Sequence, residues 1–258
     1  MPTSRQAVPP PSRATQSKES SRSKRAAILA TATQHFGDHG YENAKWADVA
    51  TVIGVGSTAL YHYFESKLHC LYVIMADALE SFIVDFERIT SEREDYLEAL
   101  VAVLRSGFDL TEAEVMRNRV LVAEQGLVGV RRTSQREEAA RELARSHTRD
   151  LEFAWASFLV RGMEQGLLPE ADPRLLTRAV LGLNTSVWHW YRPGGTVRLA
   201  DVADFFVRRQ LAVLGLSPDL ADEVSGAEAG GGESSSSVRA PATRRRTGGR
   251  GKKKQLER

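Results

Sequence analysis

Residues 48–67 read DVATVIGVGSTALYHYFESK, and this stretch decides the fold of the first part of the chain. Two short segments with a helical spacing of apolar residues flank a turn at residues 52–55 that contains Gly54. This spacing is typical of a helix-turn-helix, in which the second helix lies in the major groove of DNA and presents its N-terminal side chains to the bases. We therefore predict a DNA-binding unit, with an ordinary helical hairpin as the alternative.

The side chains at the start of the second segment are short, so this helix can lie close to the bases. The hydroxyls of Ser57 and Thr58 can donate or accept hydrogen bonds, and Ala59 can contact a thymine methyl group. Three later residues can reach the phosphates, and these are Tyr61, His62 and Lys67.

Apolar spacing of three and four residues continues through the rest of the chain, with no strand-like alternation of useful length and no internal repeat. The expected helices cover about 23–39, 44–52, 57–63, a long stretch capped by Ser66, and then 95–108, 112–122, 135–165, 173–191 and 200–214. The predicted fold is all-α, with a small N-terminal domain of three helices and a larger C-terminal helical bundle.

The two ends differ from the middle in composition. Residues 1–20 are rich in Pro and Ser, and residues 217–258 pass through Gly and Ser into a run of Lys and Arg. Such segments bury too little apolar surface to offset the entropy of ordering, so we expect two disordered tails. The expected domains between them are a DNA-binding domain at 21–67 and a second helical domain at 68–216.

Composition and missing motifs exclude several classes of protein. The 258 residues contain one Cys, so neither a disulfide framework nor a Cys-based zinc cluster can form within one chain. No apolar stretch approaches the ~20 residues of a membrane span, and the start lacks the apolar core of a secretory signal, so we expect a soluble, cytoplasmic protein with no membrane partner. The chain has no Gly-rich phosphate loop and no G-x-S-x-G elbow, so we expect no enzyme, no catalytic residue, no cofactor and no metal site.

Four motifs follow one another in the first part of the chain: FGDHGY at 36–41, DVA at 48–50, GV at 54–55 and LYHYFESK at 60–67. Their order and gaps resemble the N-terminal domain of TetR-family transcriptional regulators. The resemblance implies a homodimer with one helix-turn-helix per subunit, a ligand pocket in the domain at 68–216, and release of DNA when a ligand binds. It also implies dimerisation through the last two long helices.

When the family's DNA contacts are transferred by position, the resemblance assigns residues 57–59 to base contacts. It assigns Tyr61, His62 and Lys67 to phosphate contacts. This sequence departs from the family at the start of the second helix, where Asn43-Ala44-Lys45 replaces the usual Thr or Ser. We expect Asn43 to cap that helix and Lys45 to supply a further phosphate contact.

Aromatic residues gather in the second domain, where residues 188–195 read WHWYRPGG at the end of a predicted helix. Such a cluster can form core, a dimer interface or a ligand pocket. Arg192 lies at the helix C-terminus, where a cation is favourable and can pair with an acidic ligand group. The candidate effector contacts are Trp155, Phe158, Trp188 and Arg192.

Residues 162–173 and 190–195 are similar to one branch of the family, whose members repress sterol-ring and fatty-acid catabolism and respond to acyl-CoA thioesters. This similarity implies a large, partly apolar, anionic effector such as an acyl-CoA.

We therefore expect a ligand-responsive dimeric repressor that binds a palindromic operator in double-stranded DNA and is released by a small molecule. The alternative is an architectural protein that coats DNA without sequence preference through its basic C-terminal tail. A third interpretation is a redox switch at Cys70, set against a buried and inert thiol.

Overall fold

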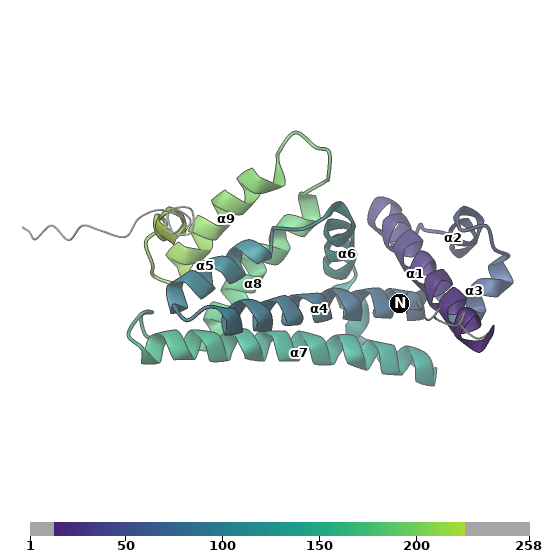
Figure 1. The fold of residues 1–258 in the computed structure, drawn as a ribbon, viewed down its shortest axis with the longest axis horizontal. Helices are drawn as coiled ribbons and strands as arrows, with labels where there is room; N and C mark the ends of the chain where they lie inside the picture. The colour runs from purple at the N-terminus through teal and green to yellow at the C-terminus, as the bar shows by residue number, and fades with distance from the viewer. Residues whose placement is uncertain (1–12, 225–258) are drawn as a thin grey trace, which may run out of the picture.

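The computed structural model describes residues 13–224, and this part of the chain is built from helices without a strand (Figure 1). The helices are α1 (Arg13–His39), α2 (Trp46–Val52), α3 (Ser57–Tyr63), α4 (Lys67–Glu92), α5 (Tyr96–Ser106), α6 (Glu112–Ala123), the 3-10 helix η1 (Gln125–Gly129), α7 (Gln135–Glu164), α8 (Pro173–Trp190) and α9 (Leu199–Val213). The prediction of an all-α fold is confirmed.

Side-chain caps explain where most of the longer helices begin. The capping residue is Ser66 for α4, Asp95 for α5, Thr111 for α6, Ser134 for α7 and Asp172 for α8. In each case the side-chain oxygen accepts a hydrogen bond from a backbone N–H of the first turn, which otherwise has no partner within the helix.

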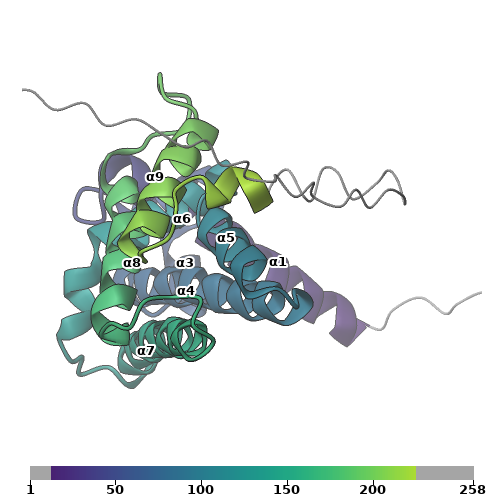
Figure 2. The same ribbon diagram turned by 90° about the vertical axis from the view of Figure 1, so that its left-hand side faces the viewer.

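Helices α4 and α7 run side by side along the length of the molecule, and α1, α2 and α3 gather at one end of α4 (Figure 1). Seen along the long axis, α7 and α9 lie on opposite sides, with α4 and α8 between them (Figure 2). This arrangement places the predicted DNA-binding helices at one end of a layered helical body.

Two apolar cores are buried, and the first joins the small unit to the rest of the protein. It contains Ile28, Val49 and Leu60 from the first three helices, together with the N-terminal half of α4. It also takes in Val120 from α6 and Ala144 from α7. The second core fills the space among α5, α7, α8, α9 and the end of α4.

Helix α1 begins at Arg13, within the stretch predicted to be a disordered tail and well before the predicted start at residue 23. The physical reason is that neither Pro nor Gly interrupts the chain between Pro11 and Gly37, so a helix can extend backwards from its packed part.

The predicted C-terminal tail also starts too early. Ala221 is 1% exposed, and Arg208 on α9 forms an ion pair with Asp222 at 2.7 Å. Leu220 and Val224 pack on the second core, because their spacing of four residues puts both on one face of a helical turn. Residues 1–12 and 225–258, with most of the predicted tails and the Lys/Arg run, lie outside the described residues. Within the described part, no helix is long and apolar enough to cross a membrane.

Candidate functional site

Helices α2 and α3 form the predicted helix-turn-helix. The turn between them closes through hydrogen bonds from Gly54 N to Thr51 O (3.1 Å) and from Val55 N to Ala50 O (3.0 Å). Gly54 has φ +71°, a left-handed conformation that costs a residue with a Cβ about 1–2 kcal/mol. Gly54 therefore allows the turn that joins α2 to α3 to form without backbone strain.

One face of α3 is exposed and the other is anchored. Ser57, Thr58, Tyr61 and His62 are exposed and Ala59 is partly exposed, while Leu60 is fully buried. The exposed positions recur at intervals of three and four residues, so they lie on one side of the helix. The structure thus brings together five of the seven residues predicted to contact DNA, and it presents short side chains at the N-terminal end.

Lys67 has an intramolecular role where the sequence predicted a phosphate contact. Its Nζ donates hydrogen bonds to the carbonyl oxygens of Tyr41 (2.6 Å) and Ala44 (3.0 Å) and lies 4.2 Å from the centre of the Tyr41 ring. These bonds occupy the ammonium group and hold the loop between α1 and α2.

The residues before α2 also differ in part from expectation. Lys45 is the N-cap residue of α2 and is exposed, as a phosphate contact requires, but it provides no side-chain cap. The Asn43 side chain donates to His39 O at 3.1 Å, so it satisfies the end of α1 and does not cap α2. An Asn between two helices can serve either end, and the sequence alone does not decide which.

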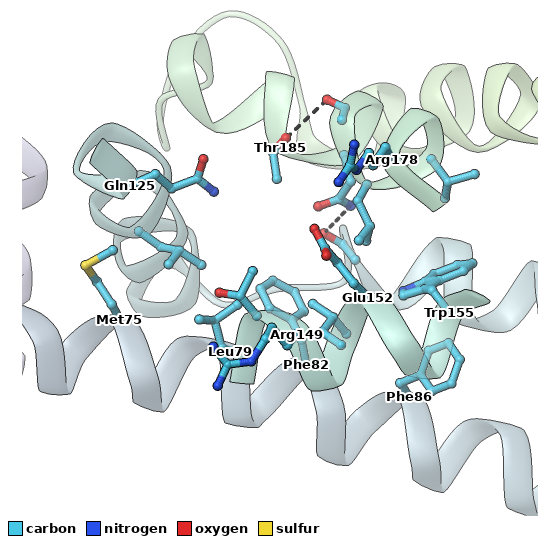
Figure 3. A pocket seen from close by; sticks show the side chains of 18 of the residues that line it. Met75, Leu79, Phe82, Phe86, Gln125, Arg149, Glu152, Trp155, Arg178 and Thr185 are labelled. Atoms are coloured by element: carbon cyan, nitrogen blue, oxygen red, sulfur yellow. Dashed lines mark hydrogen bonds between the residues drawn. The ribbon is translucent and has the colours of Figure 1, made fainter. Parts of the chain in front are cut away.

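A cavity of about 510 Å³ lies in the helical body, with lining residues from α4 to α9 (Figure 3). Met75, Leu79, Phe82 and Phe86 line it from one stripe of α4, and Trp155 joins them from α7. Because these side chains are apolar, the cavity suits the apolar part of a small molecule.

Charged residues surround the exposed part of this cavity. Arg145, Arg149 and Glu152 on α7 and Arg178 on α8 line it and are all exposed. Both α7 arginines pair with Glu142, at 3.5 and 3.2 Å. Arg178 makes no hydrogen bond or ion pair with any of the described residues, so its guanidinium can donate hydrogen bonds to an anionic group of a ligand.

Only Trp155 of the four predicted effector contacts lines this cavity. Phe158 is turned into the core, where its ring stacks on Tyr96 at 4.6 Å. Trp188 is 2% exposed and packs on Phe108. Both differences from the prediction have one cause. An aromatic residue on a helix can face a ligand or fill the core, and the side chains of Phe158 and Trp188 pack in the core.

Arg192 also misses the main cavity. Its Nη1 donates to Tyr191 O at 3.1 Å, so the cation satisfies the end of α8, and it lines a separate hollow beside Gln34 and Met116. The preference of a cation for a helix C-terminus is thus met within the chain. The α4 stripe was missed because an apolar helical face carries the same pattern whether it borders a core or a cavity.

Besides the hydrogen bonds of Lys67 on α4, two groups of polar contacts connect the DNA-binding helices with helices that line the cavity. Arg119 of α6 is 8% exposed and donates from Nη2 to Gly37 O of α1 (3.2 Å) and from Nη1 to Tyr191 O after α8 (2.7 Å). We call this contact the Arg119 clasp, and it ties α1, α6 and α8 together.

The second contact joins the start of α7 to the residues between α3 and α4. Ser134 donates to the Glu65 carboxylate, Ser66 donates to the Glu137 carboxylate, and Arg136 lies 3.9 Å from Glu65. We call this contact the α7 latch. It attaches the helix that carries Trp155 directly to the base of α3.

Cys70 is completely buried within the first core, and burial raises the pKa of its thiol. The reactive form of Cys is the thiolate, which this environment disfavours. The structure therefore favours the inert thiol over a redox switch.

A helix-turn-helix with an exposed second helix, joined to a helical body that contains an apolar cavity, defines a DNA-binding regulator of the one-component kind. Comparison with known families agrees. Residues 28–71 match the model of bacterial regulatory proteins of the tetR family, and residues 113–214 match the model of the Tetracyclin repressor-like C-terminal domain, so that together they span more than half of the chain. The chain belongs to the TetR family, and the prediction of a transcriptional regulator that is not an enzyme is confirmed.

Similar proteins are found among repressors and solved regulators. The chain is 24% identical over 186 residues to the HTH-type transcriptional repressor KstR2 of Mycolicibacterium smegmatis, covering 72% of this chain and 87% of the relative. It is 26% identical over 198 residues to KstR2 of Rhodococcus jostii, covering 76% and 92%. The crystal structure of the TetR-family regulator PfmR from Thermus thermophilus superimposes with a TM-score of 0.60 at 28% identity, covering 73% of this chain and 97% of PfmR. AibR in complex with isovaleryl coenzyme A and operator DNA shares the fold, with a TM-score of 0.60 at 22% identity over 75% of this chain and 98% of AibR.

Proposed function

We propose that this chain is a dimeric repressor that binds a palindromic operator through α3 and leaves it when an acyl-CoA occupies the cavity. One observation carries the proposal: three helices that line the cavity also hold the DNA-binding helices. Helix α4 continues directly from the helix-turn-helix, α6 carries the Arg119 clasp, and α7 carries the α7 latch. A ligand that moves any of the three would change the position of α3.

The exposed face of α3 supports the assignment of DNA contacts. We assign base contacts to Ser57, Thr58 and Ala59, because they lie at the N-terminal end of the helix and are small. Phosphate contacts fall to Tyr61, His62 and Lys45, all of which are exposed. We take the functional units to be a DNA-binding domain that ends at residue 67 and an effector and dimerisation domain that starts at residue 68. The second domain includes residues 217–224, because Leu220 and Val224 pack on the second core.

Exposed apolar side chains on α8 and α9 support a homodimer through these two helices. Leu175 on α8 is 64% exposed, and Phe205 on α9 is 54% exposed. Burial of these groups against a second copy removes apolar surface from water. A DNA-bound regulator of this kind works in the cytoplasm, which is the location we propose.

The lining of the cavity supports an effector with an apolar part and an anionic part. Its volume of about 510 Å³ falls within the range of about 300–1,000 Å³ found for ligand pockets. The apolar stripe of α4 suits an acyl group, and the unpaired guanidinium of Arg178 suits a phosphate of coenzyme A. The proposed class of effector is therefore an acyl-CoA thioester.

The mechanism follows from the spacing that a dimer imposes on its two α3 helices. They fit successive major grooves when they are about 34–36 Å apart. An effector that prefers a different spacing shifts the population away from the DNA-binding state, by no more than its difference in affinity for the two states. A coupling of about 1.4 kcal/mol already weakens operator binding tenfold.

The first experiment is recovery of sheared genomic DNA with the purified full-length protein, followed by sequencing. We expect a small set of fragments that share a palindrome. Uniform recovery without a motif would overturn the proposal in favour of DNA coating through the basic tail. Deletion of residues 239–258 separates the two, because specific binding survives that deletion and coating does not.

Thr58→Glu tests the base contacts at the recovered operator. A carboxylate at the N-terminal end of α3 meets phosphates and base acceptors, so specific binding should be lost while the dimer stays intact. Thr196→Glu is the matched control, because it makes the same charge change at an exposed residue between α8 and α9. Normal operator affinity of Thr58→Glu would contradict the site assignment.

The effector class is tested by titrating the protein–operator complex with acetyl-CoA, decanoyl-CoA and hexadecanoyl-CoA, with free coenzyme A as the control. At least one thioester should release the DNA, and failure of all three would refute a saturated acyl-CoA thioester as the effector. Arg178→Glu should raise the concentration needed for release by about tenfold or more, since a hydrogen bond to a charged group contributes about 1.5–3 kcal/mol. Arg174→Glu is the matched control, because Arg174 is exposed on the same helix outside the cavity lining.

A further inference from the structure

Gln210 is a buried polar residue in the wall of the cavity. It lies on α9, lines the cavity, and is 1% exposed. A fully buried amide normally has partners for both its nitrogen and its oxygen, because an unpaired polar group away from water is costly.

The orientation of the Gln210 amide is fixed by one hydrogen bond. Its Nε2 donates to the backbone oxygen of Val180 on α8 at 3.0 Å. A carbonyl oxygen only accepts hydrogen bonds, so the amide nitrogen must face Val180, and the flipped orientation would place two acceptors against each other. The Oε1 atom therefore points away from Val180.

Oε1 of Gln210 is buried and has no hydrogen-bond partner among the described residues. The Thr177 hydroxyl, also buried without a partner, does not bond to it. Two other polar side chains that line the cavity from α8, those of Asn184 and Thr185, have partners. Asn184 donates to Gly107 O at 3.4 Å and accepts from Trp188 Nε1 at 3.3 Å, and Thr185 donates to Gly182 O at 3.2 Å.

We propose that Oε1 of Gln210 accepts a hydrogen bond from the effector, so that the part of the effector inside the cavity is an apolar body with a hydroxyl or N–H donor. This inference rests on the proposed function, since it takes the cavity as the effector site. It narrows the class of effector, because a plain saturated acyl chain leaves Oε1 unpaired. A site that hydrogen-bonds a ligand group discriminates against the analogue that lacks it.

Two pairs of small aromatic probes test the donor without the coenzyme A part. The first pair is 2-naphthol and 2-methoxynaphthalene, and the second is indole and 1-methylindole. Within each pair only the first compound has a donor, and the indole N–H donates without accepting. Isothermal titration calorimetry of the full chain should show each donor compound binding about three- to tenfold more tightly than its partner.

Gln210→Leu should remove this preference by lowering affinity for the donor compounds alone. Gln125→Leu is the matched control, because Gln125 lines the same cavity from η1 but is exposed, so its amide has access to water. The preference should survive in that variant. Equal affinities within both pairs in the wild-type protein would overturn the proposal, even if Gln210→Leu does not fold. A preference that persists in folded Gln210→Leu, or failure of all four probes to bind, would overturn it as well.

The outcomes for the proposed function remain distinguishable. Release of operator DNA by an acyl-CoA together with equal affinities for the paired probes would refute the donor inference alone. A donor preference that depends on Gln210, without release of DNA by any acyl-CoA, would refute the proposed effector class and leave the donor inference intact.

Discussion

Gly162 on α7 lies where a Cβ would collide with the ring of Tyr96, the first residue of α5. A Cβ at this position would lie 2.3 Å from the Tyr96 Oη and 2.4 Å from its Cζ. Tyr96 is itself held by a hydrogen bond to Phe158 O at 3.2 Å and by stacking on the Phe158 ring. The obstacle is therefore a rigid, buried ring, and Gly162→Ala forces it to move.

The magnitude follows from three contributions. Overpacking of a filled core costs about 1–3 kcal/mol. Loss of the Tyr96 hydrogen bond adds about 1 kcal/mol. Replacement of Gly by Ala inside a helix stabilises by about 1 kcal/mol in the opposite direction. We therefore expect Gly162→Ala to lower the free energy of unfolding by about 1–3 kcal/mol.

Gly37→Ala provides a matched control on α1. Its Cβ would lie 2.5 Å from Met116 Cε, which is the end of a flexible side chain that can turn aside. The helix-propensity gain is similar, so we expect the free energy of unfolding to stay within about 1 kcal/mol of the wild-type value or to rise.

Chemical and thermal unfolding of both variants at one protein concentration checks this difference, since dimer stability depends on concentration. Each kcal/mol lost should lower Tm by about 2–4 °C for a chain of this size. The packing argument is refuted if Gly162→Ala is as stable as the wild-type protein, or if the two variants change by the same amount.

Arg119→Lys should reduce the effect of the effector on operator affinity by about tenfold, because one ammonium group cannot reach both carbonyls of the Arg119 clasp. Titrations of operator binding check this, and unchanged release of DNA would show that the clasp does not couple effector binding to operator affinity. The hydrogen bonds from Arg141, and then from the backbone of Arg132, lower the pKa of Glu138 to about 2. A carboxyl whose pKa is lowered by folding stabilises the protein above its ordinary pKa and loses that contribution as the pH falls from about 4.5 toward 2. Thermal unfolding should therefore show a deficit for Glu138→Gln at pH 7 that shrinks at pH 3, and a deficit independent of pH would contradict it.

The helices were predictable where a local signal fixes them. Pro173 and the capping oxygen of Asp172 mark the start of α8, and the turn with Gly54 marks the helix-turn-helix. These signals act within a few residues of one another, so they can be recognised without the tertiary structure.

The partners of individual side chains were much harder to predict. Lys67 and Arg192 are cations next to loops or helix ends, and both bind backbone carbonyls of their own chain. Nothing in the local sequence distinguishes that use from contact with a phosphate or an acidic ligand. The cavity depends on how α4, α7 and α8 fit together, and the orphan oxygen of Gln210 depends on a carbonyl thirty positions away in the chain.

The first core has a consequence for the engineering of hybrid regulators. Because Leu60 and Phe64 share a continuous apolar cluster with Val120 and Ala144, a cut at residue 67 would split one hydrophobic interior between two parents. The α7 latch adds a hydrogen bond from Ser134 to Glu65, which a DNA-binding domain taken from another protein would have to reproduce. Substitution of only the exposed residues of α3 keeps both the first core and the α7 latch. Operator preference can therefore be exchanged between relatives with less loss of stability by changing the surface of this one helix than by replacing the whole DNA-binding domain.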